Sequence, residues 1–187
     1  MGVSNMGLFE KEKQKKQLYR KKDGKYEYIG NLRRYTGSED ELKKTKLILW
    51  LCAAPALVCA IASGCIPATG MVNNLFVLIP FAVELCVLLF LCARLAEFSL
   101  SGSEIREDLY EKCVPSFSAQ ATVIEIAAGI TAAAEIIRFF VSSGTVSLSS
   151  TLIVAGLQLL CMGLCMMFAK KVGGMDFELV YGTAAQS

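Results

Sequence analysis

The chain has 187 residues, of which 54% are apolar and only 19% are charged, and this balance excludes an ordinary soluble domain. The formal net charge is only +2, but 13 of the 19 Lys and Arg residues precede Leu47, so the charge is strongly segregated. We therefore expect an integral membrane protein with a basic amino-terminal arm.

Residues 1–46 form this arm, which we expect on the cytosolic side of the plasma membrane. Eight basic residues lie between Lys11 and Lys25, where anionic lipid headgroups would attract each one by about 1 kcal/mol. Residues 8–20 are predicted as a helix on the membrane surface, and a solvated segment that merely sets the topology is the simpler alternative. The pattern at 25–30 indicates a short strand or hairpin.

A cytosolic helix is predicted to begin after Ser38 and to run directly into the first membrane span. Ser38 and Glu41 have the spacing of a capping box, in which each side chain accepts a hydrogen bond from the other residue's backbone. The span that follows, 47–66, has 20 residues and no charge. As a helix it is about 30 Å long, which matches the hydrocarbon core of a bilayer.

Three further apolar segments are long enough to cross the bilayer, and they differ in the polar residues that they carry. The second span contains Glu84, the third contains Glu125, Glu135 and Arg138, and the fourth contains Gln158 as its strongly polar residue. Their predicted bounds are 75–96, 119–141 and 151–169. The transmembrane domain is therefore expected over 47–169.

The distribution of basic residues predicts the orientation of these spans. The outer loops 64–74 and 142–150 contain no Lys or Arg, so 18 of the 19 basic residues lie on the cytosolic side and Arg138 is the exception. We expect an all-α polytopic membrane protein, a bundle of four transmembrane helices with the N-terminus and the C-terminus cytoplasmic. The middle loop 97–118 and the tail 170–187 are then cytosolic, and the loop's acidic residues should attract the arm's lysines.

No cleavable signal peptide is expected, because the first long apolar stretch begins only near Leu47. The eight cysteines lie almost entirely within apolar segments, where packing is their expected use.

Small residues are expected where helices approach each other closely, because packing rather than hydrophobic burial drives association in lipid. Ala56, Ala60 and Gly64 recur at four-residue spacing in the first span, and Gly129 and Ala133 do so in the third. These two helices are therefore predicted to form the interior.

Ionisable residues at membrane depth are the candidate polar site, because a charge there is costly and needs a partner or a proton. In the functional interpretation, Glu84 takes up and releases a proton or holds a cation. In the structural interpretation, fixed ion pairs set the helix register. We expect any site between the second and third spans, with Glu135 beside Arg138, Arg138 within reach of Glu84, and Glu125 paired with Arg94.

The sequence contains no His and no cluster of acidic residues typical of metal sites, so we expect no enzyme, no catalytic residue, no cofactor and no metal. A non-enzymatic scaffold or accessory subunit is the first hypothesis; it would bind a partner through the arm and the middle loop. A small oligomeric proton- or cation-coupled transporter or channel subunit built around Glu84 is the alternative. The expected partners are the lipid bilayer and other copies or subunits, but not nucleic acid.

Overall fold

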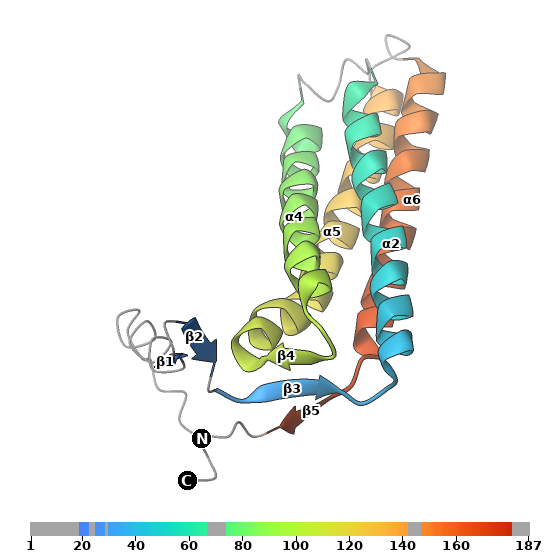
Figure 1. The fold of residues 1–187 in the computed structure, drawn as a ribbon. Helices are drawn as coiled ribbons and strands as arrows, with labels where there is room; N and C mark the ends of the chain where they lie inside the picture. The colour runs from blue at the N-terminus through green and yellow to red at the C-terminus, as the bar shows by residue number, and fades with distance from the viewer. Residues whose placement is uncertain (1–18, 23–24, 29, 67–73, 142–146, 181–187) are drawn as a thin grey trace, which may run out of the picture.

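The computed structural model describes residues 19–22, 25–28, 30–66, 74–141 and 147–180, and Figure 1 shows their fold. Within these residues four long helices pack side by side and a small sheet lies at one end of them. The helices are α2 (Glu39–Cys65), α4 (Leu75–Leu100), α5 (Glu107–Val141) and α6 (Leu148–Gly173). Three of them, α2, α4 and α6, are long and apolar enough to cross a membrane. The expectation of a helical protein with helices able to cross a membrane is thus confirmed for three helices.

The helices are arranged in a ring. α2 packs against α4, α4 against α5, α5 against α6, and α6 against α2. Consequently α4 lies opposite α6, and side chains that α4 sends inward can meet side chains from α6. This order decides which polar residues become neighbours.

The start of α2 agrees with the sequence prediction. The Glu41 backbone N–H donates to Ser38 Oγ at 3.2 Å, and the Ser38 backbone N–H donates to Glu41 Oε2 at 3.0 Å, so both halves of the capping box are present. α4 is capped in a related way, because the Phe76 N–H donates to Asn74 Oδ1 at 3.0 Å. Local polar residues therefore define both starting points.

Most of the segment 97–118, which the sequence predicts as the cytosolic connection between the second and third spans, is helical. α4 continues to Leu100, and α5 begins at Glu107 and runs for 35 residues. Glu107 and Asp108 lie in the first turn of α5, where the positive end of the helix dipole favours acidic side chains. A helix of this length extends over about 50 Å, well beyond a hydrocarbon core.

Among the described residues two small sheets accompany the helices, and only the first is expected from the sequence. Antiparallel pairing joins β1 (Tyr19–Lys22) to β2 (Lys25–Tyr28), which confirms the predicted hairpin. The predicted surface helix over 8–20 lies outside the described residues, except for its last two, which belong to β1.

A second, three-stranded antiparallel sheet brings together segments that are far apart in the sequence. β3 (Leu32–Tyr35) is its central strand, with β4 (Glu104–Arg106) on one side and β5 (Phe177–Val180) on the other. Figure 1 shows this sheet across the end of the helices where α2 begins. We call β3, β4 and β5 together the three-stranded cap.

Aromatic and charged side chains attach the cap to the start of α5. The Phe177 ring makes edge-to-face contacts with Tyr35 and Tyr110, with ring centroids 5.5 and 5.1 Å apart. The Arg33 guanidinium lies 4.7 Å from the centre of the Tyr110 ring and 3.7 Å from the Glu107 carboxylate. The expected attraction between the arm and the middle segment thus takes the form of arginine contacts, and Arg34 also pairs with Glu104.

Two of the three small residues predicted at helix contacts in α2 are buried and the third, Gly64, is exposed, whereas neither of those predicted in α5 is buried. Ala56 and Ala60 are fully buried, and a Cβ at Gly64 would lie only 2.8 Å from the Phe81 ring of α4. Ala133, in contrast, is exposed and Gly129 is half-buried. The buried small residues of α5 lie on a neighbouring face of that helix; they are Ala121, Ala127, Ala128 and Ala132.

Candidate functional site

Glu84 points into the interior between the helices. Its exposed fraction is 0%, although the other buried residues of α4 are all apolar: Val77, Leu88, Leu91, Leu95 and Phe98. Neither carboxylate oxygen has a hydrogen-bond partner among the described residues. A buried acceptor without a partner costs about 1–3 kcal/mol, and more if it is charged. Glu84 is therefore the main polar anomaly of α4.

The polar side chains that face Glu84 come from α6 and α2. Gln158 and Cys161 lie beside its carboxyl group, although neither meets the geometry of a hydrogen bond to it, and Cys59 approaches from α2. A site between the second and third spans is expected from the sequence, whereas the ring order places side chains of α6, the fourth span, opposite Glu84. In the sequence, Gln158 is the strongly polar residue of the otherwise apolar fourth span, and this feature could have indicated a neighbour of Glu84.

Gln158 connects Glu84 to α2. Its Nε2 donates to Ser63 Oγ at 2.9 Å, and Ser63 Oγ donates to the Ala60 carbonyl at 2.8 Å. Its other polar atom, Oε1, has no partner among the described residues. We call Glu84, Gln158, Cys161 and Ser63 the Glu84 cluster; all four side chains are fully buried.

Glu135 and Arg138 of α5 form the ion pair that the sequence predicts. The Arg138 Nη2 and Nε atoms donate to Glu135 Oε2 at 2.8 and 3.1 Å. Both residues are buried, with exposed fractions of 0% and 9%. Arg138 thus uses these donors within its own helix, and the possible contact with Glu84 is not among the ion pairs of the described residues.

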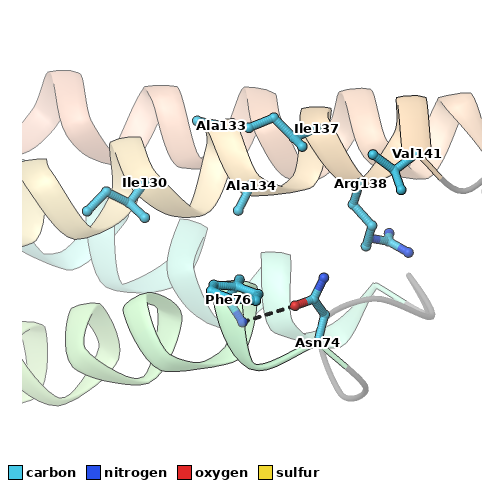
Figure 2. Close-up of a pocket in the computed structure, with 8 residues that line it drawn as sticks. All are labelled: Asn74, Phe76, Ile130, Ala133, Ala134, Ile137, Arg138 and Val141. Carbon is cyan, nitrogen blue, oxygen red and sulfur yellow. Dashed lines mark hydrogen bonds between the residues drawn. The ribbon is translucent and has the colours of Figure 1, made fainter.

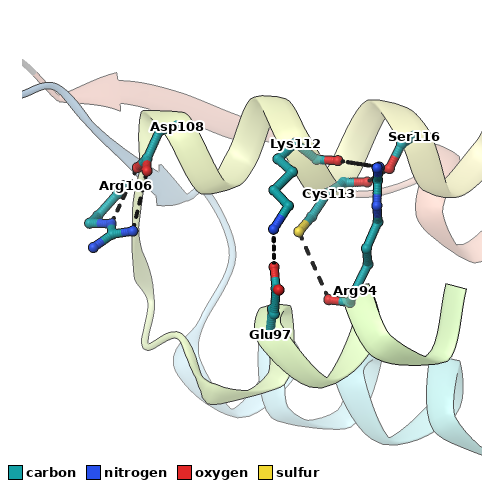
Figure 3. A network of polar contacts seen from close by, with 7 residues as sticks. All are labelled: Arg94, Glu97, Arg106, Asp108, Lys112, Cys113 and Ser116. Atoms are coloured by element: carbon teal, nitrogen blue, oxygen red, sulfur yellow. Dashed lines mark hydrogen bonds and ion pairs between the residues drawn. The ribbon is translucent and has the colours of Figure 1, made fainter. Parts of the chain in front are cut away.

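The predicted pair of Glu125 and Arg94 does not form. Arg94 Nη1 instead donates to the Lys112 carbonyl at 2.7 Å, and Lys112 Nζ donates to Glu97 Oε2 at 2.7 Å, as Figure 3 shows. Glu125 is half-buried farther along α5. The reason is that α5 begins well before the third predicted span, so the end of α4 meets the first turns of α5 instead.

Cys113 belongs to the same junction between α4 and α5, ahead of the third predicted span. Burial raises the pKa of its thiol, with a further contribution from the nearby Glu97 carboxylate. The protonated thiol donates to the Arg94 carbonyl at 3.8 Å (Figure 3). The junction is therefore held by neutral and charged contacts together, and it shows no group prepared for nucleophilic chemistry.

An apolar groove lies at the other end of the molecule, between the start of α4 and the end of α5. Its volume is about 610 Å³, and Figure 2 shows the Arg138 guanidinium on the same side as Asn74. Its lining is otherwise apolar, comprising Phe76, Ile130, Ala133, Ala134, Ile137 and Val141.

All eight cysteines are free, and five of them are buried. In the part of the chain that the structure describes, no group of three or more acidic or Cys side chains is arranged to hold a metal ion. Comparison with protein-family models, curated proteins and solved structures finds no match for this chain. The site must therefore be interpreted from its own chemistry, and an isolated buried carboxyl group is suited to exchanging a proton.

Proposed function

We propose that the chain is a four-span protein of the plasma membrane, with both ends cytoplasmic, that acts as a non-enzymatic scaffold or accessory subunit. The observation that carries this proposal is the three-stranded cap. It joins the segment before α2, the connection between α4 and α5, and the segment after α6 into one folded unit. A preformed surface of this kind is what a subunit needs to hold a partner.

Two observations support the four crossings. β3 enters α2 and β5 leaves α6 at the same end of the helices (Figure 1), which agrees with an even number of crossings. In α5, the long helix that is not among the three with the length and composition of a span, Arg138 is neutralised by Glu135. An ion pair within one helix reduces the cost of placing both groups at membrane depth.

The partner surface that we propose is the β1–β2 hairpin together with the cap. The arginines of β3 already contact the chain's own Glu104 and Glu107. The hairpin is basic in sequence, with Arg20, Lys21, Lys22 and Lys25. An acidic protein surface is therefore the partner chemistry that fits, and anionic lipid headgroups are the competing one.

The test is deletion of residues 1–30 from the full chain, which leaves β3 and its partners in place. Chemical crosslinking in native membranes should show a product in the intact chain that the deletion loses. Charge reversal of Lys21 and Lys22 to Glu should also lose the product, whereas the same change at Lys43 and Lys44 on α2 serves as the control. A product that persists after the deletion would rule out the hairpin as the docking site.

Proton- or cation-coupled transport is the second candidate, and the buried, unpartnered Glu84 favours it. Purified protein in liposomes should then move protons or a cation down an imposed gradient. Glu84→Gln should abolish that flux, and Glu125→Gln, which changes a half-buried carboxyl on α5, should retain it. Equal flux in both variants would exclude Glu84 as the coupling residue.

A further inference from the structure

Three fully buried oxygen atoms in the Glu84 cluster have no hydrogen-bond partner among the described residues. They are both carboxylate oxygens of Glu84 and the Oε1 atom of Gln158. Acceptors without donors are rare in protein interiors, and each needs an explanation. The Gln158 amide and the Cys161 thiol lie beside the Glu84 carboxyl group without meeting hydrogen-bond geometry, and Gln158 Oε1 lacks a donor.

We propose that the Glu84 cluster binds a single proton, which Glu84 carries as a neutral carboxylic acid and donates in a hydrogen bond to Gln158 Oε1. Protonation converts one carboxylate oxygen into an O–H donor and leaves the other as an acceptor for the Cys161 thiol. One proton thus provides partners for two of the three oxygens, the protonated Glu84 oxygen and Gln158 Oε1. The second Glu84 oxygen is left to the adjacent Cys161 thiol, and no other covalent bond changes.

A metal cation fits the cluster less well than a proton. Hard cations such as Ca²⁺ and Mg²⁺ are bound by about six or more oxygens. The cluster offers the two Glu84 oxygens and Gln158 Oε1, while Ser63 Oγ already accepts from Gln158 and donates to Ala60. The Cys161 thiol is a soft ligand that such ions do not prefer.

Release of the proton has a defined structural consequence. The Gln158 amide can turn by about 180° so that Nε2 donates to the charged carboxylate and Oε1 accepts from Ser63. Ser63 must then stop donating to the Ala60 carbonyl, and the change reaches α2. The cluster therefore has two hydrogen-bonded arrangements that differ by one proton and involve α4, α6 and α2.

No other charge compensates Glu84 from the helices around it. α2 contributes the Cys59 thiol, and α6 contributes Cys161 together with Gln158. The charged pair buried in α5, Glu135 and Arg138, is bonded internally. The inference deepens the second candidate function by naming its ligand, and it also holds for a proton sensor that transports nothing.

Infrared spectroscopy of the full chain in lipid nanodiscs tests the proposal directly. At neutral pH the wild type should show the C=O band of a protonated carboxyl group, shifted in deuterated water. The band should remain in Glu125→Gln and disappear in Glu84→Gln. In Gln158→Leu it should persist at the higher frequency of a carboxyl group that has lost its hydrogen-bond acceptor.

The outcomes separate the proposals. Absence of the band from the wild type at neutral pH, or its persistence in Glu84→Gln, would overturn the proton site. If Glu84→Gln does not fold, labelling the glutamate side chains with ¹³C identifies the wild-type band as a glutamate carboxyl group. The change in the frequency of this band in Gln158→Leu then assigns it to Glu84. An unchanged frequency in Gln158→Leu would overturn the proposal. If the band behaves as expected but the protein shows no flux in liposomes, the proton site is supported and transport is excluded.

Discussion

At the scale of single residues, burial determines how much a polar contact contributes to the stability of the folded protein. The Glu135–Arg138 pair is almost fully buried, whereas Arg34 and Glu104 keep exposed side-chain fractions of 59% and 42%. Exposed ion pairs contribute about 0–1 kcal/mol, but breaking a buried pair leaves an uncompensated charge. The same type of contact therefore has different consequences in these two places.

Arg138→Leu should destabilise the folded protein by about 3 kcal/mol, because Glu135 is left buried without its partner. The double variant that also carries Glu135→Gln should recover most of this loss, since no buried charge remains. Thermal unfolding in a fixed detergent measures both values. Additive losses in the double variant would show that the two residues do not act as a pair.

Arg33→Ala should lower the stability by about 1–2 kcal/mol, because it removes both the contact with the Tyr110 ring and the ion pair with Glu107. Arg34→Ala, on the same strand but with an exposed partner, should change it by less than about 0.5 kcal/mol. The same unfolding assay compares the two. Equal losses of stability in the two variants would show that the positive charge of β3, rather than the contact with the Tyr110 ring, provides the stabilisation.

At the scale of elements, the central strand of the cap depends on two partners that are distant in sequence. In the pairing of β3 with β4, Leu32 lies opposite Arg106. In the pairing of β3 with β5, Leu32 lies opposite Val180 and Tyr35 lies opposite Phe177. Beside β5, the Thr36 N–H donates to the Asp176 carbonyl at 3.2 Å. Short strands of three or four residues gain stability only through such pairing and the packing around it.

A chain that ends at Asp176 should therefore lose protection in β3. Without β5, the β3 amides that it covered are exposed on one edge, and the Tyr35 and Tyr110 rings lose Phe177. Hydrogen exchange followed by mass spectrometry should show faster exchange in residues 32–35, with α4 and α6 unchanged. A chain that ends at residue 181 is the matched control, and equally fast exchange there would contradict the explanation.

At the scale of the whole molecule, the helices were predictable and the cap was not. Charge-free length indicates α2 and α6, and the Ser38 capping box lies within four consecutive residues. β3, β4 and β5 pair instead over separations of about 70 residues or more, which local patterns do not encode. Glu84 was identified from its cost in a membrane, but Gln158 was not, because its role depends on the ring order of the helices.

The proposed topology makes a direct prediction for labelling with a membrane-impermeant thiol reagent. A Cβ added at Gly102 meets nothing within 4 Å, so Gly102→Cys provides an accessible thiol beside the cap. It should react only in inverted vesicles. The exposed Cys65 at the other end of α2 should react only in intact cells, with Cys65→Ser as its control. Labelling of both thiols from the same side would reject the topology.

The order of the strands in the chain also constrains how the protein is made. β3 leaves the ribosome before α2, but β5 emerges only after α6. The edge of β3 that pairs with β5 therefore stays open throughout synthesis of all four helices. This edge can close only after α6 has been synthesised, so an interrupted chain keeps an unpaired strand edge that can pair with another chain.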